Sequence, residues 1–247
     1  MSESNHTRRR AIGAVCAALA ALNTLSAEAA FVDPQSSSWG GWSRSDAGAA
    51  YAGWNFFADE TAPGGVITDS TPDLSANTLL GGGAGSGPPL ASIGFSAAQV
   101  TETTGGAFVT GGGNIYSPSV ATDFDITLNL TNALVGPVRV ALQTRTLGSE
   151  LDYAGVRVNG VAADAITELE RITLGGFGGD QVDTLFVWTL AAGVSSLAFD
   201  VMAAESSVSF DALTVDVAPV PLPAAAWLLG CALVPLARRV RHGGCFS

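Results

Sequence analysis

A strict alternation of polar and apolar residues over positions 123–130 most constrains what this chain can fold into. The stretch reads Asp-Phe-Asp-Ile-Thr-Leu-Asn-Leu, so every second side chain is apolar. A period of two places all the apolar side chains on one face of a β-strand, whereas an α-helix would scatter them around its axis. The stretch therefore predicts a half-buried strand with one face toward solvent.

The same signature recurs toward the C-terminus, in short runs separated by turn-forming residues. Further strands are predicted at 138–143, 184–190, 197–201 and 208–217, with turns at Gly136-Pro137 and Asn159-Gly160. In the last run the apolar phase changes, so we expect a β-bulge near Asp211 and Ala212. Residues 162–170 are predicted to form a short helix or a turn. Many short strands with regular punctuation predict an all-β fold, a single β-sandwich or jelly-roll domain over residues 30–218.

The N-terminal segment has the three parts of a secretory signal peptide. A basic stretch at 8–10 precedes an apolar stretch at 11–25, and Ala27-Glu28-Ala29 forms an A-x-A cleavage signal. The apolar stretch is shorter than the roughly 20 residues that span a bilayer. We expect residues 1–29 to form a signal helix that signal peptidase removes during export of the body.

The C-terminal segment combines a proline motif, an apolar run and arginines, in that order. The residues of this motif are Val220, Pro221, Leu222, Pro223, Arg238 and Arg239. The apolar run between them is about as short as a membrane-spanning helix can be. The positive-inside rule places the arginines in the cytoplasm and the body outside. The sequence therefore predicts a transmembrane sorting helix within residues 219–241 and a short cytoplasmic extension at 242–247.

This order of motif, helix and arginines resembles the PEP-CTERM sorting tail of Gram-negative bacteria, in its V-P-L-P form. Leu222 stands where the commonest form has an acidic residue, and the extension after Arg241 departs from the family's usual ending. The resemblance implies recognition by an exosortase, a membrane cysteine protease that cuts near the proline motif. It also implies an inner-membrane precursor that becomes part of the cell surface, outer envelope or extracellular matrix, in association with exopolysaccharide or biofilm.

The composition of the body excludes several classes of function. Five arginines and twenty acidic residues give residues 30–217 a net charge of −15, and the stretch has no lysine, histidine or cysteine. Such a body repels nucleic acid, so we expect no DNA or RNA partner. Ser-His-Asp, Cys-His, zinc and lysine chemistry all need side chains that the body lacks. Among the catalytic groups considered, only a carboxylate pair such as Glu150 and Asp152 remains. This leaves a carboxylate-dependent glycoside hydrolase as a remote alternative.

Two binding sites are conceivable in the body. Trp39, Trp42 and Trp54 lie close together in the sequence, and exposed indole rings could stack on a polysaccharide. The alternative is that the three rings pack the first strands onto the core.

The second conceivable site is for a cation. The stretch 209–215 is similar to the last strand of jelly-roll carbohydrate-binding modules, in which a structural calcium often joins the first strand to the last. That resemblance nominates Asp211 and Asp33 as calcium ligands, because carboxylates suit hard cations. The alternative is a solvated acidic surface.

The sequence favours an exported, non-enzymatic protein of the cell surface or matrix, with a structural or adhesive role. Its expected partners are signal peptidase and exosortase during export, and extracellular polysaccharide afterwards. The alternative is a carbohydrate-binding module with a structural calcium, which exposure of Trp39 and Trp42 on one face would favour.

Overall fold

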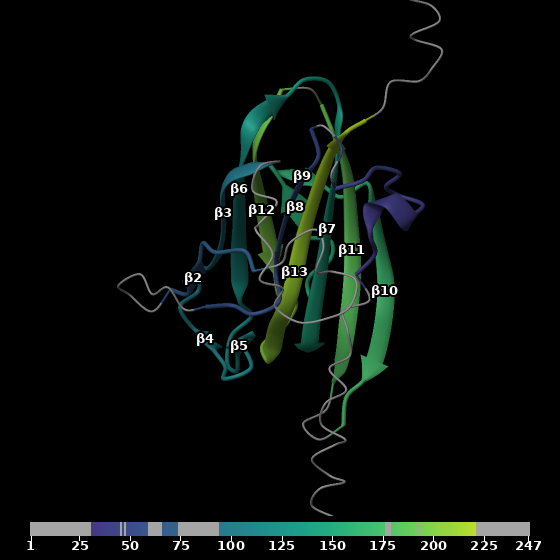
Figure 1. The fold of residues 1–247 in the computed structure, drawn as a ribbon. Coiled ribbons are helices and arrows are strands. Elements are labelled where there is room, and N and C mark those ends of the chain that lie inside the picture. The colour runs from purple at the N-terminus through teal and green to yellow at the C-terminus, as the bar shows by residue number, and fades with distance from the viewer. Residues whose placement is uncertain are drawn as a thin grey trace, which may run out of the picture.

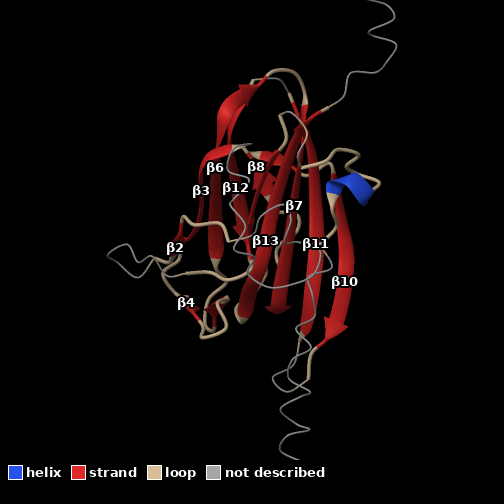
Figure 2. Ribbon diagram, viewed as in Figure 1, coloured by secondary structure: helices blue, strands red, loops and turns tan. Residues whose placement is uncertain are grey.

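The chain folds into β-strands that form two antiparallel sheets (Figure 1). The computed structural model describes residues 31–44, 46, 48–58, 66–73, 94–175, 179–191 and 193–220. A short 3₁₀ helix, η2 (Pro34–Ser36), precedes the first strand, and Asp33 caps it by accepting a hydrogen bond from the Gln35 N–H. Figure 2 shows η2 at the side of the strand-built body, beside one end of β10.

The larger sheet has seven strands within these residues. They are β1 (Ala50–Trp54), β4 (Phe108–Val109), β5 (Ile115–Ser117), β7 (Val138–Gly148), β10 (Ala165–Thr173), β11 (Asp180–Leu190) and β13 (Val208–Pro219). Their order is β10-β11-β7-β13-β5-β4, and β1 pairs with β13 on the same side as β5. Strand β13 therefore lies inside the sheet, with β7 along one edge and β5 and β1 along the other.

The smaller sheet has six strands within the same described residues. They are β2 (Thr68–Asp69), β3 (Phe95–Glu102), β6 (Asp123–Leu134), β8 (Arg157–Val158), β9 (Val161–Ala162) and β12 (Val194–Met202), in the order β2-β3-β6-β12-β8-β9. The two sheets face each other as two layers (Figure 1). The chain is sandwich-like, because one cluster of buried side chains draws on both sheets.

The core between the sheets follows the alternation in the sequence. In β6, Phe124, Ile126 and Leu128 are fully buried, and the residues between Phe124 and Leu128 are exposed at every second position. The ring of Phe124 stacks on that of Phe210 in β13, at 4.5 Å between centroids. The prediction of a half-buried strand at 123–130 is confirmed, and an all-β fold is confirmed with it.

The outer face of the larger sheet is also buried along β7, β11 and β13, because the N-terminal segment crosses it. We call the described residues of 31–49 the N-terminal strap. The side-chain amide of Gln143 in β7 pairs with both backbone groups of Val32, accepting from the N–H at 2.7 Å and donating to the carbonyl at 3.1 Å. Consequently β7 is buried on both faces along most of its length.

Several local predictions can be compared directly with the strands. Asn159 and Gly160 join β8 to β9 with φ values of 50° and 76°, which fits a two-residue hairpin turn. The pairing of β13 with β7 shifts register between Phe210 and Ala212, so the expected bulge is confirmed. The helix or turn predicted at 162–170 is wrong, because most of that segment belongs to β10 and pairs with β11.

The predicted signal helix at 1–29 and the sorting helix after Val220 lie outside the described residues. Across the ranges that are described, no helix has the length and apolar character to cross a membrane.

Candidate functional site

Two buried ion pairs hold the outer face of the larger sheet. Arg44 of the strap donates from Nε and Nη2 to the two carboxylate oxygens of Asp216, at 2.5 and 2.7 Å. Their side chains are 4% and 0% exposed, and the guanidinium also lies 4.1 Å from the Tyr51 ring centroid. Burial raises the pKa of Asp216 and would lower that of Arg44, but the direct hydrogen bonds oppose both effects. The pKa of Arg44 ends above its ordinary value, and the two direct hydrogen bonds to Asp216 fasten the strap to β13.

The second ion pair joins β7 to β11. Arg145 donates from Nε and Nη2 to both oxygens of Asp183, each at 2.7 Å. The Phe31 ring of the strap lies 6.0 Å from this guanidinium. The strap therefore passes over charged as well as apolar groups, which explains why polar residues of the larger sheet are buried.

The three candidate tryptophans differ in how much of each side chain is exposed to solvent. Trp54 is fully buried, so its ring packs in the core and offers no exposed face to a sugar. Trp42 is only 7% exposed and packs against Ala49 and Ala218. Trp39 is half-buried, with its ring edge-on to Trp42 at 5.5 Å. Trp39 lines a hollow of the surface that the described residues form.

That hollow, which we call the Trp39 groove, lies between the strap and strands β10 and β11. It has a volume of about 600 Å³. Its apolar part consists of Val32, Trp39, Ala165, Leu169, Leu185 and Val187, and its polar part consists of Ser36, Ser37, Ser38, Arg139, Asp164, Thr167 and Thr189. An aromatic ring beside hydroxyl and charged groups suits a ligand with both apolar and polar faces.

Hydrogen bonds position the polar groups of the Trp39 groove. Arg139 donates from Nη1 to the Trp39 carbonyl at 2.8 Å, which ties the strap to β7. Asp164 accepts from the Thr189 N–H at 2.6 Å. The indole Nε1 of Trp39 and the Nε of Arg139 are buried without a partner among the described residues. Buried donors of this kind ordinarily have an acceptor, so these two are exceptions to the usual pairing of buried polar groups.

The two proposed calcium ligands lie beside different arginines. Asp33 caps η2 and lies 3.9 Å from Nη1 of Arg44. Asp211, at the bulge of β13, is close enough to Arg145 and Asp183 to interact electrostatically, and burial raises its pKa. Among the described residues, no three His, Cys, Asp or Glu side chains gather as a metal site would require. The calcium site remains a prediction.

The carboxylate pair considered for glycoside hydrolysis is Glu150 and Asp152, and the surroundings of Glu150 differ from those that a general acid needs. Glu150 accepts hydrogen bonds from Nη1 of Arg171 at 2.7 Å and from the Tyr153 hydroxyl. These bonds lower the pKa of Glu150, whereas a general acid at neutral pH needs a raised pKa. Asp152 is exposed in the turn that follows. The arrangement gives no support to acid catalysis by this pair.

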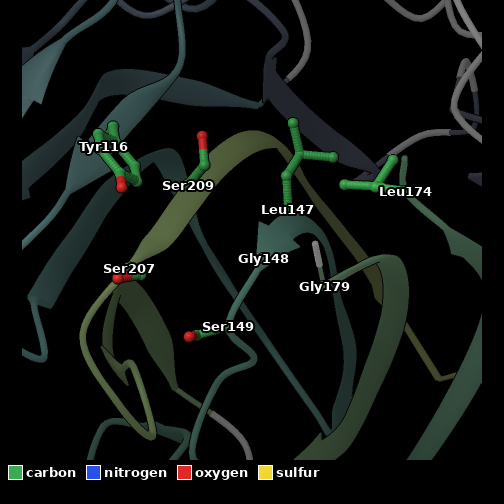
Figure 3. Close-up of a pocket in the computed structure, with 8 residues that line it drawn as sticks. All are labelled: Tyr116, Leu147, Gly148, Ser149, Leu174, Gly179, Ser207 and Ser209. Carbon is green, nitrogen blue, oxygen red and sulfur yellow. The ribbon is translucent and has the colours of Figure 1, made fainter. Parts of the chain in front are cut away.

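A second hollow, which we call the end pocket, lies where β5, β7 and β13 meet Leu174, which follows β10, and Gly179, which precedes β11 (Figure 3). Its volume is about 660 Å³. It is lined by Tyr116, Leu147, Gly148, Ser149, Leu174, Gly179, Ser207 and Ser209. The sequence analysis missed it, because its lining residues come from five separate segments and form no motif. The only signal was the glycine-rich stretch around 175–179.

A scan against protein-family models finds no match, and a search of curated proteins finds no similar sequence. The similarity of the tail to the PEP-CTERM motif therefore rests on the residues of the motif itself.

Proposed function

We propose that this chain is an exported, non-enzymatic protein of the cell surface or extracellular matrix, with a structural or adhesive role. Its signal peptide would direct export, and its V-P-L-P tail would be the substrate of an exosortase. On this proposal the sandwich-like body is a jelly roll. The chain crosses from one sheet to the other between β6 and β7, between β11 and β12, and between β12 and β13, which supports this topology.

The observation that supports this proposal best is the position of β13. The strand ends at Pro219, directly before the proline motif, and the Val220 N–H donates to the Pro137 carbonyl at 2.9 Å. Strand β13 pairs with β7 throughout and with β5 and β1 on its other edge. A load on the tail would reach the sheet as shear on the hydrogen bonds at both edges of this strand. Such an attachment suits a domain that is held by its C-terminus.

The sorting part of the proposal is tested by replacing the prolines of the motif. The variant Pro221→Ala, Pro223→Ala, produced in an exosortase-bearing host, should accumulate as an uncleaved membrane species on an immunoblot of cell fractions. Pro118→Ala changes an exposed proline outside the motif and should be processed like the natural chain. Normal processing of the double variant would contradict the sorting function.

A second candidate function is polysaccharide binding in the Trp39 groove, as in a carbohydrate-binding module. The supporting observation is that the half-buried Trp39 ring shares one hollow with hydroxyl groups, Arg139 and Asp164. The apolar face of a sugar can stack on the ring, while its hydroxyls bond to the polar part. This function would give the surface protein its adhesive role.

Binding in the Trp39 groove is tested on an array of oligosaccharides with the full-length chain. Trp39→Ala should lose binding, whereas Trp39→Phe keeps a flat ring and should retain part of it. Thermal unfolding of each variant, followed by circular dichroism, shows whether the fold is kept. Equal binding by the natural chain and a folded Trp39→Ala variant would argue against this site.

A further inference from the structure

We infer that the end pocket is a binding site for an uncharged, hydroxyl-rich ligand, a neutral sugar residue, separate from the Trp39 groove. The two hollows lie at different levels of β11, because Gly179 precedes this strand and Val187 lies near its far end. At about 3.3 Å per residue, these positions are about 26 Å apart along the strand. One sugar residue cannot occupy both hollows.

The lining of the end pocket combines a flat ring with apolar side chains. Figure 3 shows Tyr116 on one side of the hollow and Leu147 and Leu174 on the other, with Ser207 and Ser149 along a third side. The Tyr116 ring is held edge-on by Phe108 at 5.7 Å between centroids, which fixes its orientation. A fixed ring opposite aliphatic side chains provides two apolar surfaces, between which the C–H face of a sugar can lie.

The hydroxyl groups of the end pocket keep part of their hydrogen-bonding capacity. Ser149 donates to the Ser206 carbonyl at 2.6 Å and can still accept. Ser209 accepts from Asn114 and can still donate. The Tyr116 hydroxyl has no hydrogen bond to any described residue. Donors and acceptors therefore both remain, which matches a ligand whose own hydroxyls do both.

The charges around the end pocket favour an uncharged ligand. No side chain that lines it, among the described residues, is charged. A neighbouring hollow shares Gly148 and Ser149 with it and is lined by Glu150 and Glu205. An anionic sugar would be repelled by these carboxylates and by the acidic body, and a cationic ligand would meet no carboxylate in the lining.

The backbone around the end pocket adopts conformations that side chains seldom allow. Gly148, Gly179 and Ser207 have φ values of 84°, 83° and 69°. A Cβ on Gly148 would lie 2.7 Å from the Ser207 carbonyl oxygen, and one on Gly179 would lie 2.7 Å from the Gly148 Cα. Three segments thus approach closely at one point, and Ser207 holds a left-handed conformation that is costly without glycine. Strain of this kind concentrates at functional sites.

The test uses the full-length chain carrying Trp39→Ala, so that binding in the Trp39 groove does not contribute. On an array of neutral and uronate-containing oligosaccharides, this chain should bind at least one neutral probe and no uronate probe. Adding Tyr116→Ala should weaken that binding about tenfold, or about 1.4 kcal/mol. Tyr116→Phe keeps the ring and should weaken it less.

A second pair of variants tests the position of the site without removing a contact. Leu174→Trp, in the same Trp39→Ala chain, should fill the end pocket and abolish binding, whereas Val161→Trp adds the same ring at an exposed position of β9 and should not. The inference fails if no neutral probe binds a folded Trp39→Ala chain, or if binding is unchanged by both Tyr116→Ala and Leu174→Trp. Neither result bears on Trp39-dependent binding by the natural chain, so the two sites are judged separately.

Discussion

Replacing Arg44 with methionine should break the ion pair that fastens the N-terminal strap to β13. The change leaves Asp216, whose side chain is 0% exposed, as a buried carboxylate without its partner. Breaking a buried pair in this way costs about 3–5 kcal/mol. Methionine keeps an unbranched apolar stem that can still pack over the Tyr51 ring, so most of the loss comes from the uncompensated charge and little from a cavity.

Thermal and urea unfolding of the full-length chain, followed by tryptophan fluorescence, measure this loss. A change of 1 kcal/mol shifts the Tm of a domain of 150–250 residues by about 2–4 °C, so Arg44→Met should lower Tm by about 6–20 °C. The deficit should shrink as the pH falls, because protonation of Asp216 removes the orphaned charge.

The control is Arg44→Met combined with Asp216→Asn, which removes the orphaned charge and should recover part of the stability. A loss below about 1 kcal/mol for Arg44→Met alone would place the pair among ordinary surface pairs. The strap would then not be fastened as the structure indicates.

Two further predictions concern stability. Burial raises the pKa of Asp73 from 3.8 to about 6, so the free energy of unfolding should fall as the pH rises through that range. Asp73→Asn keeps an acceptor for the Asn55 N–H. At pH 7 this variant should be more stable than the natural chain by about 1–2 kcal/mol, after allowance for partial exposure of Asp73, and at pH 4 the gain should be absent. Equal pH profiles of the two chains in urea titrations would contradict this. Phe124→Ala removes a fully buried ring and should cost about 3–5 kcal/mol in urea unfolding, against less than about 0.5 kcal/mol for the exposed Met202→Ala. Similar losses in these two variants would show that Phe124 does not lie in the core.

The strands that could be predicted are those whose two faces differ. In β6 one face meets the core and the other meets solvent, so burial and sequence alternate together. Strand β10 lies at the edge of the larger sheet and is exposed over most of its length, so no apolar pattern marked it. Its glutamates and leucine suit a helix, and pairing with β11 overrides that preference.

The candidate site could be predicted only in part. The cluster of tryptophans was visible, but which ring stays accessible depends on contacts between distant residues, such as Val32 with Gln143, 111 positions apart. The strap buries Trp42 and leaves Trp39 beside a groove. Sequence alternation cannot show that the outer face of a sheet is covered by a segment without regular structure. The end pocket depends in the same way on turns brought together by the fold.

The most direct test of the proposed adhesive function is affinity electrophoresis in gels that contain an extracellular polysaccharide. The natural chain should be retarded relative to a gel without polysaccharide, and Trp39→Ala should be retarded less, because the Trp39 groove has lost its ring. Equal mobility of the natural chain in both gels would contradict the proposal that this domain holds polysaccharide at the cell surface.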